Sequence, residues 1–459
     1  MALDRQTQPR EAVGVTPPAH PLGFWASYRA ARRNVLELIP EAAYRERVLS
    51  GGRGAGWIML SEPDAIERVL KTRADAYPKS EVTLRLMSPR RGQNLITADA
   101  PTWRWQRRAM APLFGPRALE AHAPAMSQAA ASAADRLAAA RGAAIDVTPV
   151  MTAATCDVIC DVALSGRDVI DRPVLTWAIE RYLAQIARIS LLDLAGVPRW
   201  VPRPGEVLDR SRARMDAMVD RIVAARKARG PSDPPDLLDL MIAAEDPETG
   251  RRMDDTDLRN NLLGLLFAGH ETTALALTWA LYLLALDPEL QAEAGALCRG
   301  TLGDRVAGAA DLAALAPVRR ILDEALRLYP PAGFMTRTAT EEDELAGRPV
   351  RAGTTVILPI FALHRHETLW EAPDVFDPGR FAPDRAEGRH RFAYLPFSSG
   401  PKVCLGTAFA LMEAQIILAT LLARFEVILP EGFVPEPRMW FTLRPGTGMR
   451  LIFRPRREC

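Results

Sequence analysis

The sequence predicts a mainly α-helical fold with small β-sheets. From Trp103 to about Leu328, alanine, leucine, arginine and glutamate recur at helical spacing. Breaks in this pattern fall where proline and glycine gather: Pro112, Gly115, residues 198–204 and residues 230–235. After Pro331 the chain changes to short β-like runs such as TTVILPIF, separated by turns up to Pro401. A largely apolar helical pattern then returns over residues 407–424.

The predicted elements near the N-terminus are short. Residues 1–20 are expected to form an extended or flexible lead, and an arginine-rich amphipathic helix follows before residue 50. The run GWIML, which starts at Gly56, predicts a strand, and a helix is expected over residues 63–70. From Phe425 the chain returns to short strands. No repeat or long linker divides it, so a single domain over residues 1–459 is expected.

Composition narrows the class of protein. The chain has 459 residues, 48% of them hydrophobic and 25% charged, which is typical of globular proteins. Its 58 basic and 56 acidic residues give a net charge of +2, which indicates no nucleic-acid partner. The five cysteines are scattered and odd in number, so a reducing compartment, the cytoplasm, is favoured over a disulfide framework. Cys156 and Cys160 are interpreted as core packing residues. The N-terminal segment lacks the unbroken apolar stretch of a signal peptide.

One apolar segment, residues 262–286, has the length of a membrane span, and Glu271 is its only formally charged residue. Charged runs at both ends look like ordinary helix boundaries, and the chain has no companion span. A central core helix is therefore the favoured interpretation, and no membrane span is expected.

A glycine- and proline-containing loop, FSSGPKVCLG, presents Cys404 just before an apolar helix. Free backbone N–H groups and the positive end of the helix dipole favour a thiolate there, so a lowered thiol pKa is expected. Small residues let a flat cofactor approach the backbone. Taken alone, Cys404 would be read as a buried small hydrophobic residue.

The central helix carries the run AGHETT at residues 268–273. The Thr272 hydroxyl is expected to bond back to the Ala268 carbonyl, which together with Gly269 would open a polar notch in the helix. A satisfied polar cluster in the core is the alternative. His270 is interpreted as a packing or hydrogen-bonding residue.

Two further pairs share a helix face by their spacing. Glu324 and Arg327 are three residues apart and can form an ion pair, a pattern that most often marks solvated surface contacts. Trp103 and Arg107 are four residues apart and can reach one anionic group, although a plain cationic face fits them too.

Together these motifs resemble the cytochrome P-450 family of haem-thiolate enzymes, in a bacterial-type form. Its hallmark Phe-x-x-Gly-x-x-x-Cys-x-Gly is met at every fixed position, and the resemblance runs from Trp103 to Gly406. It implies the family's fold, with haem b between the long central helix and the helix after the cysteine loop, and with Cys404 as thiolate ligand of the iron.

The resemblance also implies residue roles. Glu271 and Thr272 match the family's acid-alcohol pair, which implies that the notch faces the haem and holds dioxygen, with Glu271 linked to solvent. Arg380 joins Glu324 and Arg327 in a structural triad. Lys402 stands where the family more often has arginine and lacks the same fork of donors, and His390 is a further candidate for the haem propionates. The implied cofactor-binding residues are Trp103, Arg107, Ala268, Arg337, Phe397, Gly400, Lys402, Cys404 and Gly406.

The implied activity is a monooxygenase that inserts one atom of dioxygen into a lipophilic substrate by hydroxylation or epoxidation. No flavin or nicotinamide fingerprint occurs, so electrons are expected from a separate ferredoxin or flavodoxin, docking on a basic face of Arg104, Arg107, Arg108 and Lys402. A non-catalytic haem sensor or ligand-sequestering protein, or a haem-thiolate isomerase or dehydratase, are the alternatives. The expected substrate contacts are apolar: Leu84, Leu86, Phe267, Ala268, Ala332, Phe334, Met335 and Phe441.

Overall fold

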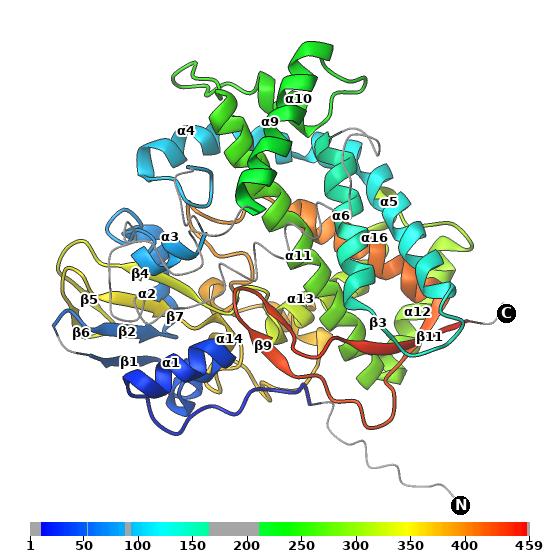
Figure 1. Ribbon diagram of the computed structural model, residues 1–459. Coiled ribbons are helices and arrows are strands. Elements are labelled where there is room, and N and C mark those ends of the chain that lie inside the picture. Colours follow the sequence, from blue (N-terminus) through cyan, green and yellow to red (C-terminus); the bar gives the residue numbers. More distant parts are fainter. Residues whose placement is uncertain (1–10, 53, 88–92, 165–210, 457–459) are drawn as a thin grey trace, which may run out of the picture.

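A computed structural model describes residues 11–52, 54–87, 93–164 and 211–456 (Figure 1). The helices are α1 (Phe24–Arg33), α2 (Pro63–Glu67), α3 (Glu81–Met87), α4 (Ala100–Met110), α5 (Pro116–Ala138), α6 (Thr148–Leu164), α9 (Ser211–Arg229), α10 (Leu237–Ala243), α11 (Asp255–Leu286), α12 (Pro288–Leu302), α13 (Ala316–Leu328), α14 (Ile360–Leu363), α15 (Pro383–Ala386) and α16 (Thr407–Arg424). The strands are β1 (Val48–Gly51), β2 (Trp57–Leu60), β3 (Ile145–Asp146), β4 (Met335–Thr338), β5 (Asp343–Leu345), β6 (Arg348–Val350), β7 (Thr355–Leu358), β8 (Phe425–Ile428), β9 (Pro437–Met439), β10 (Leu443–Pro445) and β11 (Arg450–Pro455).

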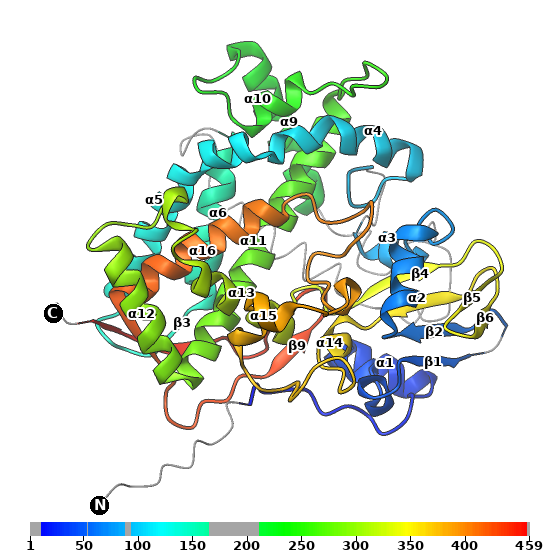
Figure 2. The ribbon, with the colours of Figure 1, turned by 180° about the vertical axis from the view of Figure 1, so that it is seen from behind.

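The strands form small sheets that lie beside a large helical body (Figure 1). The largest sheet has the order β1-β2-β7-β4, in which β2 and β7 are parallel and the other neighbours antiparallel. The strands β3, β11 and β8 form a second sheet at the other side of the molecule, while β9 and β10 pair as a hairpin. Seen from behind, α5, α12 and α16 cover the side opposite the four-stranded sheet (Figure 2).

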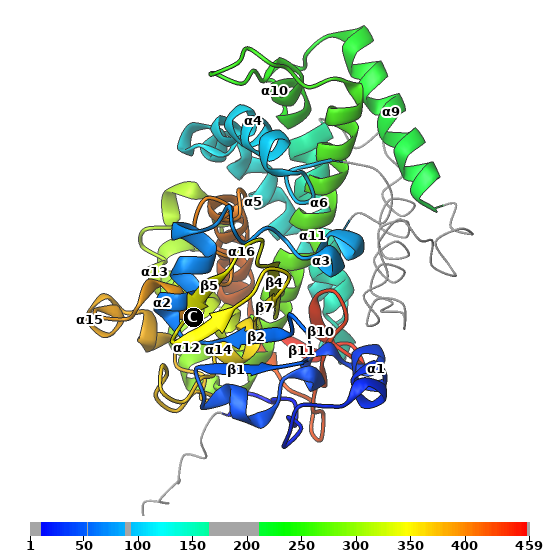
Figure 3. The same cartoon turned by 90° about the vertical axis from the view of Figure 1, so that its left-hand side faces the viewer.

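Helix α11 crosses the middle of the molecule (Figure 3), with the four-stranded sheet on one side and helices α5 and α6 on the other (Figure 1). The side chain of Asp254 caps its first turn by accepting from the Asp257 amide. The helix ends at Asp287, whose side chain caps α12 in turn, and Pro288 begins that new helix. Most of α11 is buried, because a helix that is apolar on all sides is stable only when protein surrounds it.

Two helices, α16 and α11, are relevant to whether the chain could cross a membrane. Within the described ranges, one helix, α16, is long and apolar enough to cross a membrane, and 78% of it is buried in the protein. A second candidate exists only if α11 and α12, which are bent by 116° at Asp287, count as one span. Most residues of α11 are buried, which agrees with the interpretation of residues 262–286 as a core helix.

The prediction of a mainly helical fold with small β-sheets is confirmed, and the differences lie at element ends. The strand predicted in GWIML is β2. The helix expected over residues 63–70 continues as a π-helical turn, Arg68–Thr72. In TTVILPIF the strand stops at Leu358 because Pro359 cannot donate to a sheet, and α14 follows. The break predicted at residues 198–204 lies outside the described residues.

The described part of the predicted N-terminal lead is extended and held in place. The Ala12 amide donates to the Asp374 carbonyl at 2.8 Å, and the Tyr329 hydroxyl donates to the Val13 carbonyl at 2.9 Å. Ala12 itself is buried. This segment therefore packs on the body of the protein, while residues 1–10 lie outside the described ranges.

Candidate haem site

A cavity of about 820 Å³ lies against α11 and collects residues from three of the four predicted motifs and from β4. Hereafter it is called the main cavity. Of the residues implied as cofactor-binding, eight line it: Trp103, Arg107, Ala268, Arg337, Phe397, Lys402, Cys404 and Gly406. They come from α4, α11, β4 and the cysteine loop, so the fold brings together segments that are far apart in the sequence.

The cysteine loop is shaped so that Cys404 faces this cavity. The Cys404 amide donates to the Phe397 carbonyl at 2.9 Å, which closes the loop, and the sulfur-bearing side chain is exposed to the cavity. Gly400 does not line the cavity. It has a φ of +73°, and a Cβ there would lie 2.1 Å from the Leu70 carbonyl oxygen, so only glycine lets the loop pack this closely.

The expectation of a lowered pKa for the Cys404 thiol was wrong for the polypeptide alone. Burial raises this pKa, and it outweighs the Gly406 amide, the Thr407 hydroxyl and the Arg107 charge, which lower it. The sequence showed the helix terminus but not the apolar surroundings. Deprotonation of such a thiol follows from ligation itself, because a metal cation binds the thiolate.

Four cations around the main cavity lack acidic partners. Arg107, Arg337, Lys402 and Lys79 line the cavity, and within the described residues none of them forms an ion pair with a carboxylate. Burial lowers the pKa of Arg337 to about 10 and also lowers those of Arg107 and Lys402. Arg337 is buried and the other three are partly buried, and cations removed from water without counter-ions are costly, so this set fits an anionic ligand such as the two propionates of a haem.

Lys79 was missed by the sequence reasoning. Burial, followed by repulsion from Arg337 and Lys402, lowers the pKa of Lys79 to about 7. The backbone of Lys79 forms an isolated β-bridge with Arg337, which places the two cations side by side. No local pattern around a single lysine indicates such a long-range pairing. His390, by contrast, lies 3.2 Å from Asp64 and does not line the cavity.

The hydrogen bond predicted within α11 is present, while the helix itself runs unbroken from Asp255 to Leu286, so the opening of a notch stays a prediction. The Thr272 hydroxyl donates to the Ala268 carbonyl at 2.7 Å, and both residues line the main cavity with Gly269. His270 is buried, and its Nδ1 lies 2.9 Å from the Leu266 carbonyl, in agreement with a hydrogen-bonding role.

Glu271 lies differently from the expectation. Its side chain is buried rather than linked to solvent, does not line the cavity, and forms an ion pair with Arg444. Burial raises the pKa of the Glu271 carboxyl, while Arg444 and the Thr442 hydroxyl lower it. Arg444 and Thr442 belong to the β9–β10 hairpin and were not singled out from the sequence.

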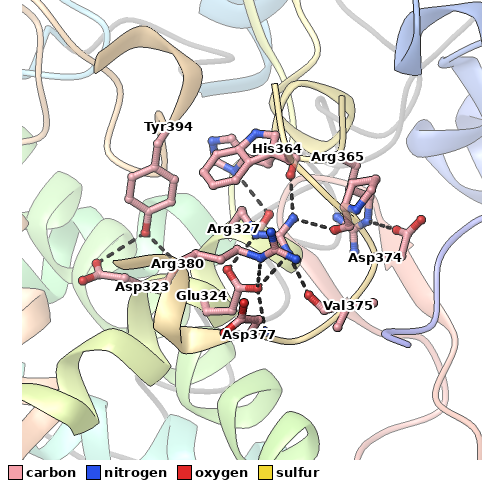
Figure 4. A network of polar contacts seen from close by, with 12 residues as sticks. Asp323, Glu324, Arg327, His364, Arg365, Asp374, Val375, Asp377, Arg380 and Tyr394 are labelled. Atoms are coloured by element: carbon pink, nitrogen blue, oxygen red, sulfur yellow. Dashed lines mark hydrogen bonds and ion pairs between the residues drawn. The ribbon is translucent and has the colours of Figure 1, made fainter. Parts of the chain in front are cut away.

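Glu324, Arg327 and Arg380 form one buried network (Figure 4). The Arg327 guanidinium donates to both oxygens of Glu324 at 2.7 Å, and the Arg380 Nε lies 3.3 Å from the same carboxylate. Arg327 also donates to three backbone carbonyls, those of His364, Pro373 and Val375. The surface-contact alternative for Glu324 and Arg327 is therefore excluded.

His364 links this network to the cysteine loop. Its Nε2 accepts from the Leu395 amide at 2.8 Å, so the ring proton is on Nδ1, which donates to the Arg327 carbonyl at 3.2 Å. Burial lowers the pKa of His364 to about 3, so it stays neutral. The triad thus reaches the segment that leads directly into the Phe397–Gly406 loop.

The expected substrate contacts divide into two groups. Ala332, Phe334, Met335 and Phe441 line the main cavity, as does Ala268. Phe267 does not, because the cavity-facing residues of α11 follow helical spacing and Phe267 falls beside that stripe, where it packs against the core. Leu84 is absent from the lining, and the side chain of Leu86 lies outside the described part.

The expected basic docking face is not a single surface. Arg107 and Lys402 line the cavity. Arg108 binds the buried carboxylate of Asp246 at 2.7 Å and Glu248 at 3.1 Å, so its charge is compensated. Arg104 is the exposed member, and it pairs with the exposed Asp75 at 3.0 Å. Sequence spacing gave no view of these acidic partners.

Comparisons with known proteins agree with this site. The family model for cytochrome P450 matches residues 50–451. Cyclooctatin synthase from Streptomyces melanosporofaciens is 34% identical over 398 residues, covering 86% of this chain and 85% of that protein. Cyclooctat-9-en-7-ol 5-monooxygenase from the same organism is 33% identical, covering 73% of each chain. The crystal structure of the cytochrome P450DA heme domain superposes with a TM-score of 0.77 at 27% identity, covering 96% of this chain and 97% of that one.

Fold, site and relatives lead to the same assignment. The main cavity offers the Cys404 sulfur, the Thr272 hydroxyl of α11 and cations without acidic partners, a set that fits a haem with its two carboxylates. The relatives named as synthase and monooxygenase support the same oxidative chemistry on a cysteine-ligated haem b. The chain belongs to the cytochrome P450 family and is a cytochrome P450 monooxygenase.

Proposed function

We propose that this enzyme uses dioxygen and electrons from a separate donor protein to oxygenate a lipophilic substrate of terpenoid-like or alkyl character. The main support for this proposal is that Cys404 and the Ala268–Thr272 turn of α11 line the main cavity together with apolar side chains. Relatives named for cyclooctatin and cyclooctat-9-en-7-ol point to the same substrate class. The few, scattered and odd-numbered cysteines of the sequence support a reducing, cytoplasmic location.

Each residue has a definite task in this proposal. Cys404 ligates the haem iron, and the haem supplies the oxidative chemistry. Arg107, Arg337 and Lys402, joined by Lys79, neutralise the propionates, while Trp103 lies under Lys402 with its ring centroid 5.7 Å from Nζ. The Thr272 hydroxyl orients dioxygen in the notch, and Glu271 supplies protons.

The electron donor is proposed to be a small acidic ferredoxin or flavodoxin. Arg104 is about half exposed, and its partner Asp75 is more exposed still, so this ion pair is solvated and open to exchange. An acidic partner can replace Asp75 at little cost, which makes Arg104 the cation of the expected face best placed for docking.

The experiment that tests the activity uses isotopically labelled dioxygen. The haem-loaded enzyme, a plant-type ferredoxin and its NADPH-dependent reductase are incubated with cyclooctat-9-en-7-ol, geranylgeraniol or lauric acid. We expect one labelled oxygen atom in a product that requires NADPH. A rearranged or dehydrated product formed without electrons would instead establish the isomerase or dehydratase, and tight binding without any product would favour the sequestering protein.

Replacing Thr272 with alanine tests the role of the notch. We expect Thr272→Ala to retain haem but to lower the product formed per electron roughly tenfold, with the missing electrons recovered as hydrogen peroxide. The measurement is the ratio of product to NADPH consumed.

Thr278→Ala is the matched control. Thr278 lies on the same helix and also donates back, to the Ala274 carbonyl at 2.8 Å, but it is fully buried and does not line the cavity. Its replacement should leave the product-to-electron ratio unchanged. Equal ratios for the two variants would show that the Thr272 hydroxyl has no special part in oxygen activation.

A further inference from the structure

Glu271 and Thr272 are neighbours in sequence but face different surroundings. Successive residues of an α-helix point about 100° apart. Thr272 accordingly lines the main cavity, while the Glu271 side chain turns towards the β9–β10 hairpin. Glu271, the proposed proton donor for the main cavity, therefore points away from that cavity.

Arg444 holds the acid in this orientation. Its Nη2 donates to Glu271 Oε1 and lies 3.4 Å from the Thr442 hydroxyl. Among the described residues, Arg444 is the only charged group that acts on the Glu271 pKa, and it opposes the effect of burial. If the carboxylate swung into the cavity, Arg444 would be left with an uncompensated, partly buried charge.

The hairpin that carries Arg444 is anchored to the protein core. The Leu443 amide donates to the Pro331 carbonyl at 3.0 Å, and the Trp279 indole of α11 donates to the Leu443 carbonyl at 3.2 Å. The turn of the same hairpin, with Trp440 and Phe441, forms part of the cavity wall. The position of the cation is therefore fixed relative to both α11 and the cavity.

We propose that Arg444 is a positioning residue that holds the Glu271 carboxyl outside the main cavity and so restrains proton delivery until the ion pair loosens. This inference rests on the proposed role of Glu271 as proton donor. It adds a second residue, from a different part of the fold, that governs when this donor acts.

The test measures electron consumption without any substrate. The probe system is the haem-loaded enzyme with a plant-type ferredoxin, its reductase and NADPH. Arg444→Met frees the carboxyl, so NADPH consumption should rise roughly tenfold. Since the acid donates only when protonated, the rate falls as pH rises through its pKa. Loss of the cation raises that pKa, so the fall should move to higher pH.

Two variants keep the test independent of general damage to the hairpin. Arg438 lies directly opposite Arg444 on the neighbouring strand, but it forms an ion pair with Glu436 and not with Glu271. Arg438→Met should therefore leave the rate of NADPH consumption near that of the wild type. Arg444→Lys keeps the charge but loses the fork of donors, and should give an intermediate rise even if Arg444→Met folds poorly.

A double-mutant cycle separates the possible outcomes. In a Glu271→Gln background, Arg444→Met should have no further effect, because the group that it releases is gone. An equal rise in that background, or no rise in either, would overturn the role of Arg444. If Glu271→Gln alone changed neither the rate nor its pH profile, the proton-donor role itself would fail, and with it the proposed function of the acid-alcohol pair.

Discussion

Replacing Cys404 with serine should remove the strongly red-shifted carbon monoxide band of the reduced enzyme and lower product formation by roughly three orders of magnitude. The reason is electronic: Cys404 would hold the haem iron as a thiolate, and a thiolate ligand would donate more electron density to the bound haem than a serine oxygen can. A loss of that size corresponds to about 4 kcal/mol in the activation barrier. The measurements are the carbon monoxide difference spectrum and the rate of product formation.

Two companion variants show whether the effect belongs to this sulfur. Cys404→His offers a nitrogen ligand, so haem should be retained while the band moves to the position of a histidine-ligated haem. Cys298→Ala removes a buried thiol of α12 that lies away from the main cavity, and the red-shifted band should persist. Survival of that band in Cys404→Ser would disprove the assignment of the ligand.

The sequence predicts the part of this site that local patterns encode. Three of its four motifs, at Trp103, Thr272 and Cys404, line the same cavity, and the Glu324–Arg327 pair forms a buried network beside the cysteine loop. Their spacing within a helix or loop already sets which side chains share a face. The helical pattern likewise predicts α11 and the extent of α16, because an apolar run bounded by clear end signals needs little tertiary information.

What the sequence does not show depends on contacts between distant segments. Lys79 meets Arg337 through a bridge across the fold, and Glu271 meets Arg444 from a hairpin far along the chain. The burial that raises the pKa of Cys404 is also a tertiary property. Phe267 was misplaced because a shift of one residue on a helix turns a side chain by about 100°.

The position of Glu271 connects these two kinds of information. The motif identifies the acid next to the alcohol, but only the fold shows that the carboxyl points to Arg444. The adjacent Glu271 and Thr272 therefore indicate proton delivery, while the proposed role of the Glu271–Arg444 ion pair is to decide when that delivery can take place. For this reason the pH dependence of electron use reports on the fold as much as on the motif.

Arg327→Met should have the largest effect on folding. Arg327 is fully buried, and its loss leaves Glu324, among the residues that the structure describes, with Arg380 and the Asp377 amide, while three backbone carbonyls lose this donor. Removing one partner of a buried ion pair costs about 3–5 kcal/mol, a large share of the roughly 5–15 kcal/mol that stabilises a typical protein. The midpoint of urea unfolding should fall accordingly, and haem should be lost at lower urea.

Arg319→Met is the control on the same helix, and it shows why burial decides the outcome. Arg319 pairs with Asp323 at 3.0 Å, but its side chain is 40% exposed, so water replaces most of what the pair provides. Its loss should cost no more than about 1 kcal/mol. Equal midpoints for the two variants would contradict a stabilising role for the triad. His364 connects the Arg327 backbone to Leu395 at the start of the loop that presents Cys404. A lower urea midpoint and earlier haem loss in Arg327→Met alone would therefore show that this loop depends on the ion-pair network.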